Sequence, residues 1–280
     1  MRVAIIGSGN VAEALALAIE RSRAELVQVY GRNRERVEVI YRAIGRVDEV
    51  VESERREQND GHGAQDEGCE SELREADIYL VAVSDGAVEE ITKELNFADG
   101  SIVAHTAASV NIEQISTRKG INRGVFYPLQ TFTKGREVEF QKIPIFIEAQ
   151  SEESYKRLEE LANLLSERVQ RLDLERRREL HLAAVFSCNF TMAMLTATQD
   201  VLRGCELPLE LYEPLLRETL DKAFSEQNDL RKSLTGPAVR GDLGTQERHI
   251  EMLSGVKESD LLIEIYKNIS KYIWETSKRI

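Results

Sequence analysis

The stretch VAIIGSGNVAEA, residues 3–14, decides the fold of this chain. Its first residues, Val3–Ile6, are apolar and mostly β-branched, which is typical of a buried strand. The turn that leads into the following helix favours a nucleotide, because Gly7 permits a tight turn and Gly9 lets the backbone approach a pyrophosphate. The free N–H groups of the first helical turn favour phosphates. We therefore predict a dinucleotide site at Gly7, Ser8, Gly9, Asn10 and Val11; the alternative is an ordinary glycine-rich turn.

Composition narrows the class of protein. The chain has 280 residues and a formal net charge of −12, with 37 Lys and Arg against 49 Asp and Glu, which argues against a nucleic-acid-binding surface. No stretch approaches about 18 consecutive apolar residues, the length of a membrane span. The cysteines Cys69, Cys188 and Cys205 lack metal-site spacing and are predicted to be free thiols. We expect a cytoplasmic protein without a membrane, nucleic-acid or metal partner.

The second predicted strand, Leu26–Tyr30, indicates which dinucleotide is bound. A fold selective for NAD usually places an acidic residue at the end of this strand to bind the ribose 2′-hydroxyl. Here Gly31 occupies that place, and Arg32, Asn33 and Arg34 follow. Guanidinium groups suit a 2′-phosphate through charge-assisted hydrogen bonds. The sequence therefore favours NADP over NAD, with a solvated basic loop as the alternative.

Strands and helices alternate up to about residue 173. Further strands are predicted at 77–83, 124–132, 143–149 and within 168–173, and the segment 100–109 repeats the pattern of a strand followed by a turn. This alternation predicts an α/β fold with a doubly wound, mostly parallel Rossmann sheet, and it allows a late antiparallel edge. Residues 47–74 are charged and nearly free of aliphatic side chains, so we expect a mobile insertion there. Its His62, Asp66 and Cys69 lack paired metal spacing.

Strand signals stop near Glu175, so we expect domains at 1–173 and 174–280, the second being all-helical. Its first helix, 175–203, is apolar on more than one face and needs burial on several sides. We therefore expect a homodimer through the helical domains. The apolar side chains expected to drive it are Leu180, Leu182, Ala183, Val185, Phe186, Phe190, Met192, Met194 and Leu195.

Several segments together resemble a known family. The strings VYGRNRER (29–36), LVAVSDGAVEEI (80–91), FYPLQTF (126–132) and LTGPAVRGDLGTQERHIEML (234–253) are similar to Rossmann-like proteins that carry a carboxy-terminal DUF2520 domain. Members are usually described as NADP oxidoreductases, and many carry His where this chain has Tyr127. The plan also resembles pyrroline-5-carboxylate reductase and the β-hydroxyacid dehydrogenases, which implies substrate bound between a Rossmann domain and a helical dimerisation domain.

Candidate site residues follow the predicted strands, whose carboxyl ends face the ligand in this fold. Val83, Ser84, Asp85 and Thr106 are expected at the cofactor. His105 is the candidate acid–base residue because the unperturbed pKa of histidine lies near neutrality; a structural histidine is the alternative. Tyr127 is a further catalytic candidate and Gln130 a substrate ligand, although Tyr127 is equally well interpreted as a packing aromatic.

The helical domain supplies further candidates. His181 and Asn189 are about two turns apart on one helical face. The resemblance to the dehydrogenases implies a substrate-orienting Lys and Asn on this helix; Asn189 matches in kind, whereas Val185 replaces the Lys. The resemblance to the reductase's substrate loop adds Thr235. Arg240 and Asp242 are interpreted as a buried ion pair or as ligands of an anionic substrate.

These observations predict an NADP-dependent oxidoreductase that reduces a small carbonyl or imine metabolite. Two alternatives stay open. One is a dinucleotide-binding protein without catalysis, which the missing Lys supports. The other is a deazaflavin-linked NADP reductase, since that group shares the pattern of the first domain.

Overall fold

A computed structural model describes residues 1–46, 73–116, 120–225 and 230–278. The chain divides into two compact units, Met1–Ala184 and Val185–Ile280. The division lies after the boundary near 173 that strand signals suggested. The predicted insertion falls almost entirely outside the described residues, and so do His62, Asp66 and Cys69.

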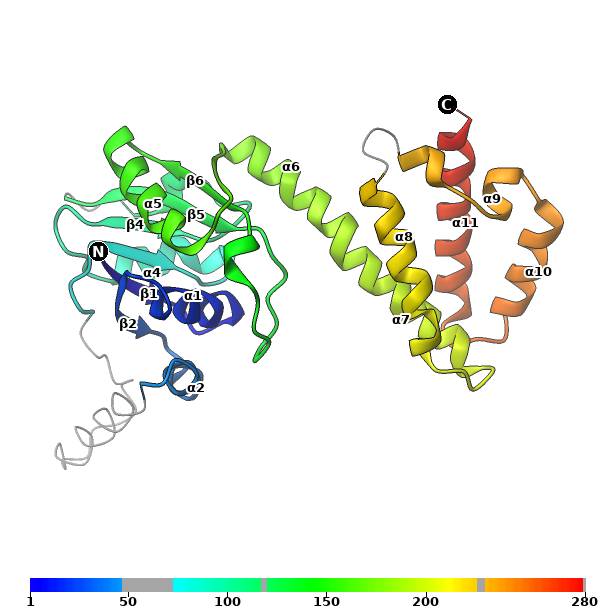
Figure 1. Cartoon of the computed structure of the whole chain (residues 1–280), viewed down its shortest axis with the longest axis horizontal. Helices are drawn as coiled ribbons and strands as arrows, with labels where there is room; N and C mark the ends of the chain where they lie inside the picture. Colours follow the sequence, from blue (N-terminus) through cyan, green and yellow to red (C-terminus); the bar gives the residue numbers. More distant parts are fainter. Residues whose placement is uncertain (47–72, 117–119, 226–229, 279–280) are drawn as a thin grey trace. The chain divides into compact units, whose positions relative to one another are not determined.

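A seven-stranded sheet organises the first unit (Figure 1). Its strand order is β2-β1-β3-β4-β5-β6-β7, and all neighbours are parallel except the antiparallel pair β5 and β6. The predicted mostly parallel Rossmann sheet with a late antiparallel edge is therefore confirmed. The strands are β1 (Arg2–Ile6), β2 (Glu25–Tyr30), β3 (Ile78–Val81), β4 (Ile102–His105), β5 (Asn122–Pro128), β6 (Ile145–Ala149) and β7 (Val169–Arg171).

Helices cover both faces of this sheet. Alternate side chains of each strand point to opposite faces, and here the side chains on both faces are apolar and need burial. Val3 and Ile5 of β1 pack in one core cluster, together with side chains of α1 (Asn10–Glu20), α2 (Arg34–Ala43) and α5 (Glu152–Leu165). Ala4 and Ile6 pack in another cluster with α4 (Val88–Glu94). Both faces of β1 are thus buried, which explains its continuous apolar run.

The end of the predicted insertion is part of the folded body. The backbone N–H of Arg74 donates to Oε1 of Gln28 (2.8 Å), and its Nη1 donates to the carbonyl of Val27 (3.0 Å). Leu73 packs against the same core cluster as Ala4 and Ile6. The expectation that the insertion reaches residue 74 is therefore wrong: these two residues are held by hydrogen bonds to β2 and by apolar contact.

The predicted long helix runs from Leu174 to Arg203. It comprises α6 (Leu174–Ala184), a π-helical stretch (Val185–Phe190) and α7 (Thr191–Arg203). Leu180 packs with Val125 and Tyr127 of the first unit, so it is not available for the predicted dimer interface. The remaining helices of the second unit are α8 (Glu213–Ser225), α9 (Pro237–Arg240), α10 (Leu243–Leu253) and α11 (Ser259–Ser277).

Leu174–Arg203 is, in the described part of the chain, the one helix whose length and composition would allow it to cross a membrane. The helix meets this criterion through its average hydropathy. Its apolar side chains do not form an unbroken run, since polar residues such as Ser187 and Asn189 interrupt them. Length and composition alone do not distinguish a membrane from a protein surface that covers the helix.

Candidate functional site

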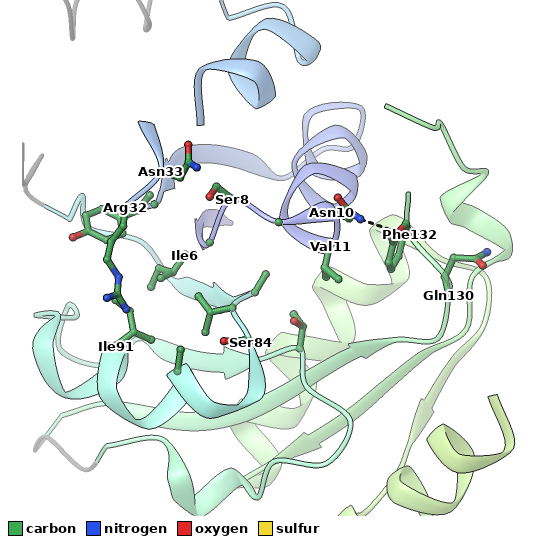
Figure 2. Close-up of a pocket in the computed structure, with 18 residues that line it drawn as sticks. Ile6, Ser8, Asn10, Val11, Arg32, Asn33, Ser84, Ile91, Gln130 and Phe132 are labelled. Atoms are coloured by element: carbon green, nitrogen blue, oxygen red, sulfur yellow. Dashed lines mark hydrogen bonds between the residues drawn. The ribbon is translucent and has the colours of Figure 1, made fainter. Parts of the chain in front are cut away.

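The loops that follow β1, β2 and β3 border a cavity of about 580 Å³ (Figure 2), a size typical of small-molecule sites. The cavity lies where ligands bind in open parallel sheets, outside the carboxyl ends of the strands. Predicted residues that line it are Gly7, Ser8, Gly9, Asn10, Val11, Arg32, Asn33, Val83, Ser84, Thr106 and Gln130. Lining residues that the sequence analysis did not assign to the cofactor or substrate are Ile6, Tyr30, Gly31, Ala82, Ala87, Ile91 and Phe132.

The glycines of this turn have different physical roles. Gly7 has φ +131°, and a Cβ there would lie 2.2 Å from the carbonyl oxygen of Ala82, so no larger residue fits. Gly9 has an ordinary extended backbone, and a Cβ there would meet no protein atom within 4 Å. The protein's own packing therefore does not require glycine at position 9, and the open space above its backbone fits a closely approaching phosphate.

Gly31 occupies the position after β2 where a fold selective for NAD usually has an acidic residue. A Cβ at this position would lie 3.1 Å from Val37 and 3.2 Å from the side chain of Ser8. A longer carboxylate would meet the same atoms unless the turn moved. Any side chain at this position therefore requires Val37 and Ser8 to shift by a few tenths of an ångström.

The arginines after Gly31 are not equivalent. Arg32 is exposed and lines the cavity, and no ion-pair partner for it is found among the described residues. Figure 2 shows its side chain extending toward Ile91 of α4. Arg34 instead pairs with Glu38 one helical turn later (3.2 Å) and is not among the lining residues. The ion pair directs the Arg34 guanidinium along α2, and the cofactor contact predicted for Arg34 stays a prediction.

Asn33 and Asp85 begin helical segments. The side chain of Asn33 lines the cavity and caps α2 by accepting the N–H of Arg36 (3.0 Å). Asp85 starts a short 3₁₀ turn after Ser84 and is not among the lining residues. Its carboxylate instead acts electrostatically on Tyr127. The predicted cofactor role of Asp85 therefore lacks a contact with the cavity.

His105 is fully buried at the end of β4. Its Nδ1 accepts the N–H of Ala107 (3.2 Å), and no protein partner for Nε2 is found among the described residues. Burial, reinforced by the positive charge of Arg177, lowers its pKa to about 3. The acid–base role predicted for His105 rested on the unperturbed pKa of histidine, which does not apply here because the charged imidazolium is not solvated. A neutral His105 holds the loop after β4 in place.

Tyr127 and His181 come together although one lies on β5 and the other on α6. The Tyr127 hydroxyl and Nδ1 of His181 are 3.3 Å apart. Tyr127 is 8% exposed. Burial raises the pKa of its hydroxyl, Arg177 opposes this and Asp85 adds to it. Tyr127 therefore keeps its proton at physiological pH, with the imidazole of His181 beside it.

Arg177 holds this second cluster together. It is 1% exposed and donates to the carbonyls of Ala108 (3.0 Å) and Val110 (2.7 Å) and to the carboxylate of Glu148 (2.5 Å). These contacts tie the loop after β4 and strand β6 to α6. Sequence reasoning missed Arg177, because nothing in the run RRR at 176–178 distinguishes the buried arginine from its neighbours.

The comparisons with known proteins match both parts of the chain. Residues 2–109 match the family model "NADP oxidoreductase coenzyme F420-dependent", and residues 143–273 match the domain of unknown function DUF2520. A structure from Bacteroides fragilis, described as a "putative NADP oxidoreductase", is 33% identical, with 98% of each chain covered and a TM-score of 0.82. This chain belongs to the same family, the Rossmann-type oxidoreductases that carry a DUF2520 domain. Comparison with curated proteins gave no match.

Two more distant structures share the fold of the oxidoreductase. A 1-pyrroline-5-carboxylate reductase from Streptococcus pyogenes is 14% identical, with 100% of this chain and 99% of that chain covered and a TM-score of 0.58. An imine reductase from Myxococcus stipitatus in complex with NADP⁺ is 15% identical, with 100% and 95% covered and a TM-score of 0.59. The predicted relationship to pyrroline-5-carboxylate reductase is thus confirmed at the level of the fold.

The remaining candidates of the oxidoreductase belong to its second unit. Asn189 lies exposed in the π-helical stretch, and Thr235 is also exposed. Asp242 caps α10 by accepting the N–H (3.0 Å) and hydroxyl (2.7 Å) of Thr245, and the latter bond above all lowers its pKa. Arg240 is exposed, so the interpretation of Arg240 and Asp242 as a buried ion pair is wrong. Binding of substrate between the two domains stays a prediction.

Proposed function

We propose that this oxidoreductase binds NADP(H) in the cavity beside Gly9 and reduces a small carbonyl or imine compound. The observation that carries the proposal is Arg32, an exposed guanidinium at the cavity with no carboxylate partner in the described part of the chain. A 2′-phosphate supplies the complementary charge. Gly31, which leaves little room for a ribose-binding acid, supports the same choice of cofactor.

The residues present fit this cofactor. The first turn of α1 offers its N–H groups to the pyrophosphate, with room above Gly9, and Arg32 with Asn33 would hold the adenosine phosphate. When bound, the nicotinamide supplies the hydride. Because its pKa is raised, Tyr127 holds a proton at Oη that can pass to the reduced oxygen or nitrogen. His181, hydrogen-bonded to that oxygen and itself exposed, can return a proton from water.

Calorimetric titration with NADPH and NADH, followed by a panel of aldehydes, ketones and cyclic imines, tests the proposal. We expect tighter binding of NADPH and oxidation of NADPH by members of the panel. Equal affinity for NADPH and NADH would contradict the role of Arg32. Tight binding without oxidation by any compound would favour the alternative of a nucleotide-binding protein without catalysis.

The match of residues 2–109 to the F420-dependent model favours a second candidate, a deazaflavin-linked NADP reductase. In that case reduced coenzyme F420 would be the hydride donor to NADP⁺. The two candidates are separated by mixing the protein with NADP⁺ and reduced F420 and following the absorbance of NADPH. Formation of NADPH would favour the second candidate.

We further propose that two copies associate through the second unit and that the protein is cytoplasmic. Among the described residues of this unit, only Leu202 and Ala238 are buried apolar side chains. Phe186, Phe190 and Met192 are 62%, 48% and 64% exposed. Such a helical unit lacks a core of its own, and exposed apolar patches of this kind mark interfaces. A second copy of the same unit supplies a matching apolar face.

A further inference from the structure

A buried glutamate lies at the centre of contacts around the cavity. Glu13, in the first turn of α1, is only 6% exposed, and its neighbours in the sequence, Ala12 and Ala14, are apolar. A buried carboxylate requires partners that neutralise it. Both of its oxygens have one: Oε2 accepts from Nη2 of Arg36 (2.9 Å), and Oε1 accepts the backbone N–H of Gly135 (3.1 Å).

Through Arg36, Glu13 is connected to the glycine turn, which is the proposed phosphate side of the cavity. Arg36 lies in α2, the helix capped by Asn33, and its Nε donates to the carbonyl of Ser8 in the glycine turn (3.3 Å). Its Nη1 is buried without a partner in the described structure. Glu13 is therefore the carboxylate that neutralises Arg36 and holds it against the turn.

The Gly135 contact leads to the opposite wall. The segment Gln130–Gly135 contributes Gln130 and Phe132 to the cavity lining. It is attached to the first turn of α1 at two points: Nδ2 of Asn10 donates to the carbonyl of Phe132 (3.1 Å; Figure 2), and Gly135 donates to Glu13. Glu13 thus links this wall to the glycine turn and to α2.

We infer that Glu13 is a positioning residue that aligns the two walls of the cofactor cavity, so that a full dinucleotide contacts both walls at once and binds more tightly. The inference rests on the proposed binding of NADP(H). Both partners of Glu13 are hydrogen-bond donors. A carboxylate accepts from both, whereas an amide of the same shape turns its NH₂ group toward one of them. Glu13→Gln therefore breaks one link without changing side-chain volume.

The test compares two ligands. Adenosine 2′,5′-bisphosphate contains only the phosphate-bearing half of the cofactor, whereas NADPH is long enough that it would also contact the wall formed by Gln130 and Phe132. Removing a charge near the phosphates affects both ligands, so the ratio of their affinities isolates the second wall. We expect Glu13→Gln to lower the preference for NADPH over the bisphosphate by about tenfold, the effect of one hydrogen bond to a charged group. Hydrogen exchange of the peptide containing Gly135 should accelerate.

Glu20→Gln is the matched control. Glu20 also lies on α1 and pairs with an arginine beyond α2, Arg46 (2.6 Å), but this ion pair contacts neither the glycine turn nor the segment Gln130–Gly135. This variant should lose stability and keep the ligand ratio, which separates positioning from a structural role. If Glu13→Gln does not fold, Glu13→Asp, which keeps the charge but shortens the reach, should lower the same ratio.

An unchanged ratio in a folded Glu13 variant of a protein that binds NADPH would overturn the inference alone. A wild-type protein that binds neither ligand would overturn the proposed cofactor, and this inference with it.

Discussion

The hydroxyl of Tyr127 lies 3.3 Å from Nδ1 of His181, although the two residues are 54 positions apart in the sequence. The sheet places Tyr127 at the end of β5, and Arg177, one turn before His181 on α6, fixes that helix through the carbonyls of Ala108 and Val110. The pair is therefore held by the fold of the first unit alone. It joins a buried hydroxyl to an exposed imidazole.

Replacing Tyr127 by Phe removes the proposed proton donor without removing the ring. We expect kcat to fall about 100-fold or more, the range for general acid catalysis, while the affinity for NADPH stays unchanged. Stopped-flow measurement of NADPH oxidation checks this. Tyr155→Phe is the control, because Tyr155 donates its hydroxyl to Glu159 on α5. Equal kcat in wild type and Tyr127→Phe would remove Tyr127 from the reaction.

Arg32→Gln and Arg34→Gln separate two arginines of the same loop. The first loses the proposed contact with the 2′-phosphate and should weaken NADPH binding by about 1–3 kcal/mol, with NADH hardly affected. The second loses an ion pair with Glu38 on the surface of α2, and we expect no change for either cofactor. Calorimetry of both variants provides the measurement. Parallel losses for NADPH and NADH in Arg32→Gln would contradict the assignment.

A methyl group should lower the stability of the protein at Gly7 and its affinity for NADPH at Gly9. Gly7→Ala places a Cβ 2.2 Å from the Ala82 carbonyl at a φ of +131°, and we expect a loss of stability of about 2 kcal/mol or more. Gly9→Ala meets no protein atom, so the melting temperature should hold while the affinity for NADPH falls. Thermal melts with and without NADPH distinguish the two. A Gly9→Ala protein with full affinity would show that no phosphate approaches this backbone.

The buried neutral His105 should make stability depend on pH. Because its pKa is lowered from 6.5 to about 3, the unfolded chain binds a proton between these values that the folded protein does not. Above pH 6.5 the imidazole is neutral in both states, and the free energy of unfolding does not depend on it. As the pH falls from 6.5 toward 3, protonation of the unfolded chain lowers the free energy of unfolding, by about 2 kcal/mol near pH 5. Urea unfolding of wild type and His105→Asn across this range checks it. If the free energy of unfolding of His105→Asn falls with pH as steeply as that of wild type, His105 is not the origin of the pH dependence.

A charge on the exposed apolar face of α7 should prevent self-association. Met192 is 64% exposed, and we expect Met192→Glu to be a monomer by light scattering, whereas wild type has about twice the 31.7 kDa chain mass. Gln199→Glu, an exposed polar position on the same helix, should leave the assembly intact. A monomeric wild-type protein would contradict the dimer. Wild-type protein that requires detergent or binds neutral lipid vesicles would instead indicate that a membrane covers this face.

The fold and the glycine turn could be predicted from the sequence because both depend on local signals. The apolar run of β1, the glycines at 7 and 9 and the arginine after β2 report burial, backbone freedom and charge at their own positions. Alternation of such signals along residues 1–173 was enough to predict a Rossmann sheet. The same local signals did not show that Arg34 pairs with Glu38, or that Arg34 and Asp85 do not line the cavity.

Only the tertiary structure decided which charged groups are buried and what they contact. Nothing local marks Arg177 among the arginines at 176–178, and the bonds of Glu13 to Arg36 and Gly135 join segments far apart in the sequence. The pKa of His105 likewise depends on its desolvation and on Arg177, which approaches from another element. Burial and electrostatics are sums over all neighbours in space, whereas the sequence names only the neighbours along the chain.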